Sequence, residues 1–238
     1  MTWSKGLLAA FDVETTGTEP LEARIVTATV LVVGATFGTW SRRWLVDPGI
    51  EIPAEAAAIH GITTEKARAE GRVASEAIEE IARLLAELWC SGLPVAGFNI
   101  AYDLTVLGCE LDRHGLAPIE TRCPSMPAID PLVIDRHVDR YRKGKRTLAV
   151  TCEFYGVTLD GAHQSESDAL AAARLAWLMA RRNPEIADMT LDELQIAQAV
   201  WHRDWAENFE AYLRAQGNAE AQIEREWPVR RRSVELAS

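Results

Sequence analysis

Three apolar, strand-like segments follow one another within the first 46 residues, and this succession restricts the possible folds more than any other feature. The segments are residues 6–14, 24–35 and 39–46, and a turn at 47–49 follows the third. Short connections allow neighbouring strands to pair directly. We therefore expect an antiparallel meander at the start of the chain.

Helical and strand-like segments alternate after the meander. Apolar residues at helical spacing predict helices over 74–90, 100–114, 147–155 and 165–182. Short strands are expected over 94–98 and within 128–134. A meander followed by such an alternation indicates an α/β fold, with a mixed central sheet flanked by helices.

Pro184 marks a boundary in this pattern. We expect a first domain over 1–183 and a C-terminal helical extension and tail over 184–238. One long helix is predicted over 191–216. Its aromatic residues recur at about fourfold spacing, at Trp201, Trp205, Phe209 and Tyr212. Such a stripe more often packs within the protein than forms a partner site. Whether it covers the first domain or contacts a polymerase or a second copy of the chain is left open.

Composition and charge narrow the functional classes. With 48% hydrophobic and 25% charged residues, the chain is globular and not disordered or fibrous. A formal net charge of -10 fits a basic DNA coat protein poorly, but an enzyme can use bound metal ions as its positive charge. The four cysteines form no CxxC pair and indicate reduced thiols in a cytoplasmic protein. The longest uncharged apolar run, 25–40, is shorter than the ~20 residues that span a membrane.

The first strand carries two acidic residues, Asp12 and Glu14. Side chains alternate along a strand, so both project from the same face. Two carboxylates on an otherwise apolar strand repel each other and lose hydration, and a divalent cation relieves both penalties. The alternative is that both lie at the strand end and meet water.

A second candidate segment follows the strand 94–98. Asp103 falls in the first turn of the next helix, and Asn99 directly precedes that helix. Considered alone, Asp103 is equally explained by its interaction with the helix dipole, and Asn99 by helix capping. This segment is therefore weak evidence for a site by itself.

A third segment pairs a histidine with an acidic residue. His163 lies in a glycine-bearing loop, and Asp168 lies in the early turns of the helix that follows. The alternative is a capping arrangement by Ser165 and Ser167, with His163 in solvent.

Taken in this order, the three segments resemble the motifs of the DEDDh-type 3′–5′ exonucleases, which include bacterial proofreading exonuclease subunits. The resemblance covers about residues 7–178, and the combination is far more specific than any single motif. One departure is Gly97, where many relatives carry His; we do not expect it to abolish catalysis. The matching residues are Asp12, Glu14 and Thr15-Thr16-Gly17 for the first motif, Asn99 and Tyr102-Asp103 for the second, and His163 and Asp168 for the third.

The resemblance implies a ribonuclease H-like fold and a phosphodiesterase that uses two Mg²⁺ or Mn²⁺ ions. Such ions, ~3.5–4 Å apart, activate water and stabilise charge on the phosphate oxygens. The implied metal ligands are Asp12, Glu14, Asp103 and Asp168. His163 is implied to take the proton from the attacking water, which suits an imidazole at neutral pH.

The resemblance also implies how substrate is held. It places Thr15 and Thr16 near the terminal 3′-hydroxyl and the segment 59–63, which contains His60, near the terminal nucleotides, with Asn99 also binding substrate. For the latter segment the alternative is that Ile59 and Ile62 are core residues and His60 is exposed. Phe98 is expected either to stack on a base or to join the core.

Basic residues are densest over 136–146, just before the third motif. This stretch is expected either to contact phosphates or to form a solvated helix face and loop.

The function expected from the resemblance is metal-dependent 3′–5′ exonuclease activity on nucleic acid. The expected substrate is the 3′ end of a single DNA strand, cleaved to 5′ mononucleotides. An RNA-trimming or oligoribonuclease-type enzyme is the main alternative, because discrimination at the 2′-OH depends on pocket shape. A catalytically silent nucleic-acid-binding module is another, although no ligand of the motifs is missing. A polymerase or a second copy of the chain is a possible partner.

Overall fold

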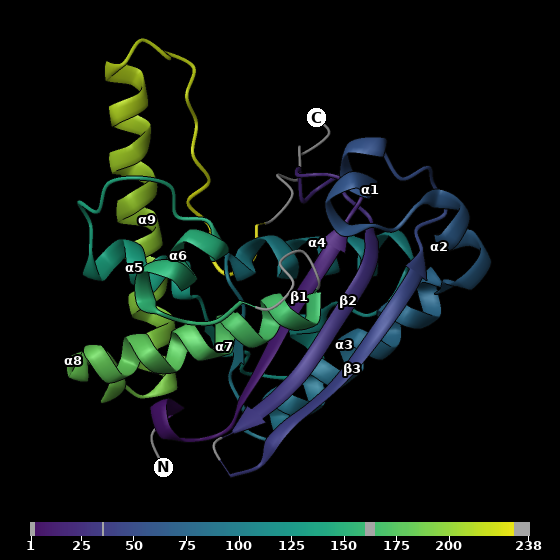
Figure 1. Cartoon of the computed structure of the whole chain (residues 1–238), viewed down its shortest axis with the longest axis horizontal. Coiled ribbons are helices and arrows are strands. Elements are labelled where there is room, and N and C mark those ends of the chain that lie inside the picture. Colours follow the sequence, from purple (N-terminus) through teal and green to yellow (C-terminus); the bar gives the residue numbers. More distant parts are fainter. Residues whose placement is uncertain (1–2, 35, 160–164, 231–238) are drawn as a thin grey trace.

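The computed structural model describes residues 3–34, 36–159 and 165–230. At its centre lies a sheet with strand order β4-β3-β2-β1-β5-β6, covered by helices (Figure 1). β1, β2 and β3 pair antiparallel, whereas β5, β6 and β4 join in parallel. The strands are β1 (Leu8–Thr15), β2 (Ile25–Gly34), β3 (Gly38–Asp47), β4 (Arg72–Val73), β5 (Val95–Ala96) and β6 (Ala128–Ile129). The predicted meander and mixed sheet are confirmed.

Helices precede, connect and follow the parallel strands. Most correspond to the predicted segments, whereas α1, α2, α5 and the short α8 were not predicted. The α-helices of the described residues are α1 (Ala54–His60), α2 (Thr64–Glu70), α3 (Ala74–Cys90), α4 (Ile100–Arg113), α5 (Pro131–Val138), α6 (Leu148–Tyr155), α7 (Ser165–Arg182), α8 (Pro184–Ala187) and α9 (Leu191–Ala215). Short 3₁₀ turns occur at Trp3–Lys5 and Ile119–Thr121.

The predicted strand within 128–134 is correct for only two residues. The pairing of β6 with β5 ends at Ile129, and α5 begins at Pro131. The Asp130 side chain caps the helix by accepting a hydrogen bond from the N–H of Leu132 at 2.9 Å. Proline at the first helical position needs no N–H partner, so Asp130-Pro131 starts a helix here.

The two faces of β1 enter different cores. Its odd-numbered residues, Ala9, Phe11 and Val13, pack with α3 and α4. Its even-numbered residues Leu8 and Ala10 pack with α7. Alternation along the strand continues this second face to Asp12 and Glu14. The two acidic side chains are therefore directed toward the side of the sheet that α7 covers.

The helix α9 closes the edge of the sheet at β6. The amide of Gln195 accepts a hydrogen bond from the N–H of Ala128 at 2.9 Å. The fully buried amide of Gln198 donates to the carbonyl of Ala128 at 2.9 Å and accepts from the N–H of Asp130 at 2.7 Å. Side chains of α9 thus satisfy the exposed backbone groups of this edge strand. Beyond this contact α9 extends away from the sheet (Figure 1).

Two further expectations concern the cysteines and membranes. All four cysteines are free thiols, and the Sγ atoms of Cys90 and Cys123 lie 2.7 Å apart. No helix within 3–34, 36–159 and 165–230 has the length and apolarity required to cross a bilayer.

Candidate active site

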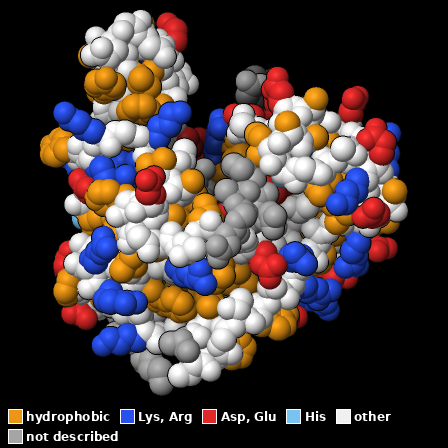
Figure 2. Space-filling model, in the orientation of Figure 1, with side chains coloured by type: hydrophobic (Ala, Val, Ile, Leu, Met, Phe, Trp, Pro, Cys, Tyr) orange, Lys and Arg blue, Asp and Glu red, His pale blue; other side chains and the backbone are white. Residues whose placement is uncertain are grey.

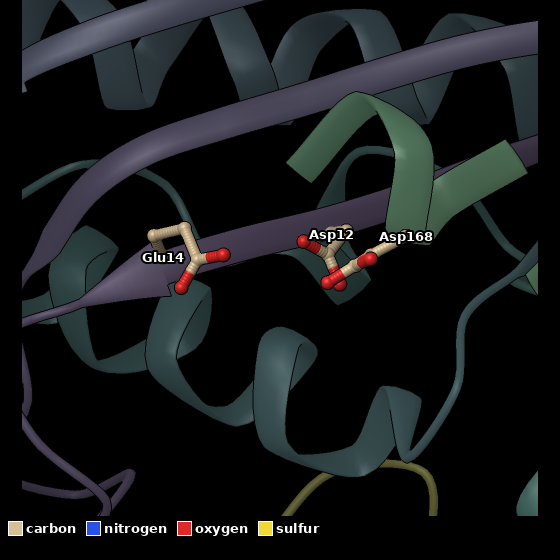
Figure 3. A group of neighbouring side chains, drawn as sticks. All are labelled: Asp12, Glu14 and Asp168. Atoms are coloured by element: carbon tan, nitrogen blue, oxygen red, sulfur yellow. The ribbon is translucent and has the colours of Figure 1, made fainter. Parts of the chain in front are cut away.

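Three carboxylates from two distant parts of the sequence converge at the end of β1. Asp12 and Glu14 come from β1 and Asp168 comes from the first turn of α7, as Figure 3 shows. One oxygen of each lies within 4.8 Å of the others. The position of α7 is fixed by the buried Ser165, whose Oγ lies 2.7 Å from the hydroxyl of Thr29 on β2. Ser165 thus ties the helix to the sheet, a contact that the capping alternative did not include.

The fourth acidic residue of the motifs, Asp103, lies on α4 and is buried. Its Oδ1 accepts a hydrogen bond from the N–H of Val13, at a donor–acceptor distance of 3.0 Å. Val13 lies between Asp12 and Glu14, so this bond fixes α4 to the segment of β1 that carries the other carboxylates. Burial raises the pKa of Asp12, and repulsion from the negative charge of Asp103 adds to the rise.

The electrostatics show that the cluster is strained when all of its members are ionised. Loss of hydration raises the pKa of Asp12 well above its usual range, and repulsion from Asp103, Asp168 and Glu14 adds to the rise. Burial, followed by repulsion from Asp168, raises the pKa of Glu14 to about 7. Burial also raises the pKa of Asp103. Burial is the largest cause of each shift and repulsion between the carboxylates adds to it, so positive charge at the site would favour the ionised forms.

These residues fit a divalent cation. Carboxylate oxygens are the donors that Mg²⁺ and Mn²⁺ prefer, and no thiolate belongs to the cluster found among the described residues. A bound cation would offset the repulsion that raises the pKa values. Asp12, Glu14 and Asp168 are placed to hold one directly.

A backbone conformation of low frequency connects β5 to α4. Asn99 has a φ of 65°, and it is the one residue other than glycine with a positive φ in the described part of the chain. Its N–H donates to Oδ1 of the buried Asp130 at 2.9 Å. The Nε1 of Trp227, a buried residue near the end of the described chain, lies 3.4 Å from the other oxygen of Asp130. Asp130 therefore joins the Asn99 turn to the C-terminal segment, and Asn99 makes no side-chain capping bond.

A pocket of about 550 Å³ opens beside the carboxylates. Its lining includes Glu14 and Thr15 from β1, Thr16 directly after the strand, His60 from α1, and Asn99. Four of the residues predicted to bind substrate thus lie around one cavity. His60 is half-buried, burial lowers its pKa, and its Nδ1 accepts a hydrogen bond from the N–H of Ile62 at 3.2 Å.

Two further lining residues, Ile59 and Tyr102, lie in segments that the resemblance covers but are not themselves among the predicted substrate-binding residues. Ile59, which the alternative placed in the core, is 55% exposed and lines the pocket. The hydroxyl of Tyr102 lies 2.5 Å from Oγ1 of Thr15 and donates to the carbonyl of Gly17. Tyr102 belongs to the second motif, and that position was the available signal. Ile59 belongs to the segment 59–63 that the resemblance placed near the terminal nucleotides, and that segment was its signal.

The other predicted residues have different surroundings. Phe98 is partly buried and packs against the core beneath α7. His163 lies outside the described residues. In the basic stretch, Arg142 and Arg146 each lie 2.5 Å from the buried carboxylate of Asp135. These two cations therefore order the turn after α5 and are not a solvated helix face.

Comparison with known proteins places these features in a family. The family model described as "Exonuclease" (RNase_T) matches residues 9–176, which contain all three motifs. DNA polymerase III PolC-type from Lacticaseibacillus paracasei is 25% identical over 182 residues, which are 76% of this chain and 12% of that protein. The PolC-type protein of Streptococcus thermophilus is 27% identical over 173 residues, which are 71% of this chain and 11% of that protein.

Solved structures show the same fold. Escherichia coli exonuclease I in complex with a dT13 oligonucleotide superposes with a TM-score of 0.64 and 20% identity, over 77% of this chain and 43% of that chain. Exonuclease I from Methylocaldum szegediense gives a TM-score of 0.62 and 22% identity, over 87% of this chain and 45% of that one. This chain thus spans less than half the length of either group of relatives. On the match of its motif-bearing region, the chain belongs to the exonuclease family.

Proposed function

We propose that this exonuclease-family protein is a metal-dependent 3′–5′ exonuclease of the DEDDh type, which shortens single-stranded DNA from its 3′ end and releases 5′ mononucleotides. The observation that carries the proposal is the convergence of Asp12, Glu14 and Asp168 within 4.8 Å, with Asp103 bonded to the same strand. This arrangement concentrates negative charge beside a pocket lined by residues of the motifs.

In the proposed site, Asp12, Glu14, Asp103 and Asp168 hold two Mg²⁺ or Mn²⁺ ions. When bound, such ions lower the pKa of water and stabilise charge on the phosphate oxygens. The protein's own contribution is to hold the ligands in place through the Val13–Asp103 hydrogen bond and the Thr29–Ser165 contact. His163, which enters the proposal from its motif alone, is the proposed base that accepts a proton from the attacking water.

The pocket beside the carboxylates is the proposed seat of the 3′-terminal nucleotide. Thr15 and Thr16 form its wall at the end of β1, and His60 and Ile59 face it from α1. An apolar side chain with polar groups nearby suits a nucleotide, which combines a flat base with a polar sugar. Asn99 also lines the pocket and is the proposed contact of the following sugar or phosphate.

The preference for DNA is supported by the relatives. The solved exonuclease I structures include complexes with dT13 and dA16 oligonucleotides, and the matched relatives are named as DNA polymerases. A polymerase partner is proposed on the same basis. The motifs are equally compatible with RNA, so the substrate test includes both nucleic acids.

The test uses single strands labelled at the 5′ or the 3′ end, in DNA and RNA versions, with Mg²⁺, Mn²⁺ or a chelator. We expect a 5′-labelled strand to shorten in single-nucleotide steps and a 3′-labelled strand to release a labelled mononucleotide at once. A circular single strand should stay intact. Asp12→Asn should abolish activity, whereas Asp112→Asn, an exposed change on α4, should not.

The other outcomes of this test would indicate a different nuclease activity or contradict the metal site. Cleavage of the circle would show an endonuclease, and faster shortening of RNA than of DNA would favour the RNA-trimming alternative. Activity retained in Asp12→Asn, or in the chelator, would contradict the metal site.

A further inference from the structure

A groove of about 680 Å³ lies between α9 and the segment formed by α5 and the turn after it. We call it the aromatic groove. One wall is α9, and the other is formed by residues 136–141. The proposed exonuclease mechanism uses none of these residues. The side chains that line both walls are Arg136, His137, Arg140, Tyr141, Val200, Trp201, Asp204, Trp205, Asn208, Phe209 and Tyr212.

The aromatic rings on α9 form a row of nearly parallel planes. Trp205 and Phe209 lie 5.5 Å apart between ring centroids with planes at 18°, and Phe209 and Tyr212 lie 6.3 Å apart at 14°. Trp201, the first ring of the predicted stripe, is partly buried and stacks on His137. The expectation that the stripe packs is therefore correct for its first residue. Farther along, Phe209 is 38% exposed and Tyr212 57% exposed.

The opposite wall adds another exposed ring and two cations. Tyr141 is 85% exposed, and the guanidinium carbon of Arg140 lies 5.7 Å from the centre of its ring. The guanidinium carbon of Arg136 lies 3.4 Å from the ring centre of Trp205 and so connects the two walls. In Figure 2, hydrophobic side chains lie over the upper part of α9 with Lys and Arg side chains below them.

The charge of the groove is positive on balance. Its lining contains Arg136 and Arg140 against one acidic residue, Asp204. The exposed Lys143 and Lys145 follow in the same turn. This is unusual in a chain with a formal net charge of -10. Exposed aromatic rings beside cations are the combination with which proteins bind single-stranded nucleic acid, because bases stack on the rings and phosphates pair with the cations.

The aromatic groove connects to the active site. A smaller pocket of about 250 Å³ shares Asn99 and Tyr102 with the catalytic pocket and shares Arg136 and Trp205 with the groove. Its lining has two acidic residues, Glu224 and Glu226, and two arginines, Arg136 and Arg230. Glu224 is paired with Arg230, with 2.8 Å between Oε2 and Nε. The three pockets therefore adjoin one another and form a path from Glu14, past Asn99, to the rings of α9.

From this path we infer that the aromatic groove binds the part of a single strand that lies upstream of the 3′ end being cleaved. The inference rests on the proposed function and extends it, since it assigns a substrate-binding role to the C-terminal helix. Bases stack on Phe209, Tyr212 and Tyr141, and Arg140 pairs with phosphates. The contact is tolerant of sequence, because every base has a flat face.

The experiment compares a short strand of about four nucleotides with a long strand of about 16 nucleotides, the range that single-strand-binding surfaces cover. The full chain is tested as native protein, as the double variant Phe209→Ala/Tyr212→Ala, as Tyr141→Ala, and as the control Phe37→Ala. Phe37 is also an exposed aromatic residue, 56% accessible, but lies in the turn between β2 and β3. The quantity compared is the ratio of kcat/KM for the long strand to kcat/KM for the short strand.

We expect the native protein to prefer the long strand, and the groove variants to lower the ratio about fivefold or more, as for the loss of one stacked base. Phe37→Ala should leave the ratio unchanged. An unchanged ratio in the groove variants of an active enzyme would overturn the inference and leave the proposed function standing. Variants that lose self-association in sedimentation but keep the ratio would identify the groove as a protein interface, which also overturns it.

A separate readout covers failure of the proposed function itself. If no strand is cleaved with any metal, binding of a labelled strand of about 16 nucleotides is measured by fluorescence anisotropy. Binding by the native chain that weakens about fivefold or more in the double variant still supports the inference. Absence of binding by the native chain overturns it.

Discussion

The carboxylate of Asp103, on α4, accepts a hydrogen bond at 3.0 Å from the backbone N–H of Val13, on β1. The bond joins the second motif to the first, ninety positions earlier in the chain. Asp103 thus has two roles that can be separated: its charge belongs to the acidic cluster, and its oxygen satisfies a buried N–H.

Two substitutions of Asp103 should separate these roles. Asp103→Asn removes the charge and keeps an acceptor oxygen, whereas Asp103→Ala leaves the N–H of Val13 without a partner. We expect the Ala variant to be less stable than the Asn variant by about 1–3 kcal/mol in urea denaturation with a chelator present. Both variants should lose about tenfold or more in kcat. Equal stabilities would show that the Val13 bond contributes nothing.

The raised pKa values predict an unusual pH dependence. The pKa of Glu14 rises from 4.5 in the ordinary case to about 7 in the folded protein. Between these two values the folded protein binds more protons than the unfolded chain, so the free energy of unfolding should fall as pH rises from about 4.5 to about 7. The raised pKa of Asp12 acts in the same direction. Urea denaturation in a chelator, at a series of pH values, measures this slope.

Glu14→Gln should reduce that slope, because one of the titrating groups is gone and Asp12 remains. Glu87→Gln, an exposed change on α3, serves as the control and should leave it unaltered. Adding Mn²⁺ to the native protein at pH 7 should raise its melting temperature by mass action. A stability that instead rises with pH in the metal-free protein would contradict the assigned electrostatics.

The hydroxyl of Tyr102 supports the wall of the pocket beside the carboxylates through Thr15 and Gly17. Tyr102→Phe removes this support and leaves the carboxylates in place. We expect KM to rise about 2–10-fold, the equivalent of one hydrogen bond, with kcat nearly unchanged. Thr15→Val should produce little further effect when combined with Tyr102→Phe, because both remove the same contact. Additive effects of the two changes would show that they act independently.

Behind the pocket, a buried ion pair holds the end of β1. Glu110 is 1% exposed, and its Oε1 lies 2.6 Å from Nε of Arg24. The backbone carbonyl of Arg24 in turn accepts a hydrogen bond from the N–H of Thr16 at 3.0 Å. Glu110→Ala should destabilise the fold by about 3 kcal/mol, since it leaves a guanidinium unpaired.

The matched control is Glu87→Ala, which removes an ion pair with Arg83 at 3.9 Å in which both side chains are more than half exposed. This change should cost less than about 0.5 kcal/mol. Chemical denaturation measures both. Similar losses for the two variants would show that burial does not strengthen the Arg24–Glu110 pair.

The sheet and its acidic strand could be predicted because they depend on local periodicity. Alternation along β1 places Asp12 and Glu14 on one face, and helical spacing over 165–182 gives the helix that carries Asp168. The helices α1 and α2 were missed, since each has seven residues and too few turns for a clear pattern. They matter because α1 supplies Ile59 and His60 to the pocket.

Contacts between segments that are distant in the sequence could not be predicted from it. Nothing in the pattern around Asp130 indicates that its two oxygens receive Asn99 and Trp227. The same holds for the aromatic groove, whose walls come from α5 and α9. Spacing places aromatic residues on one side of a helix, but it does not determine which of them the neighbouring helix covers.

The position of Trp227 has a consequence for how the protein unfolds. Its indole fills space in the core next to α4 and anchors the carboxylate that holds the Asn99 turn. A chain cut after α9 would leave a void there and release the turn from its anchor. The C-terminal segment therefore stabilises the Asn99 turn beside the proposed active site. We expect this segment and the sheet domain to unfold in a single cooperative transition.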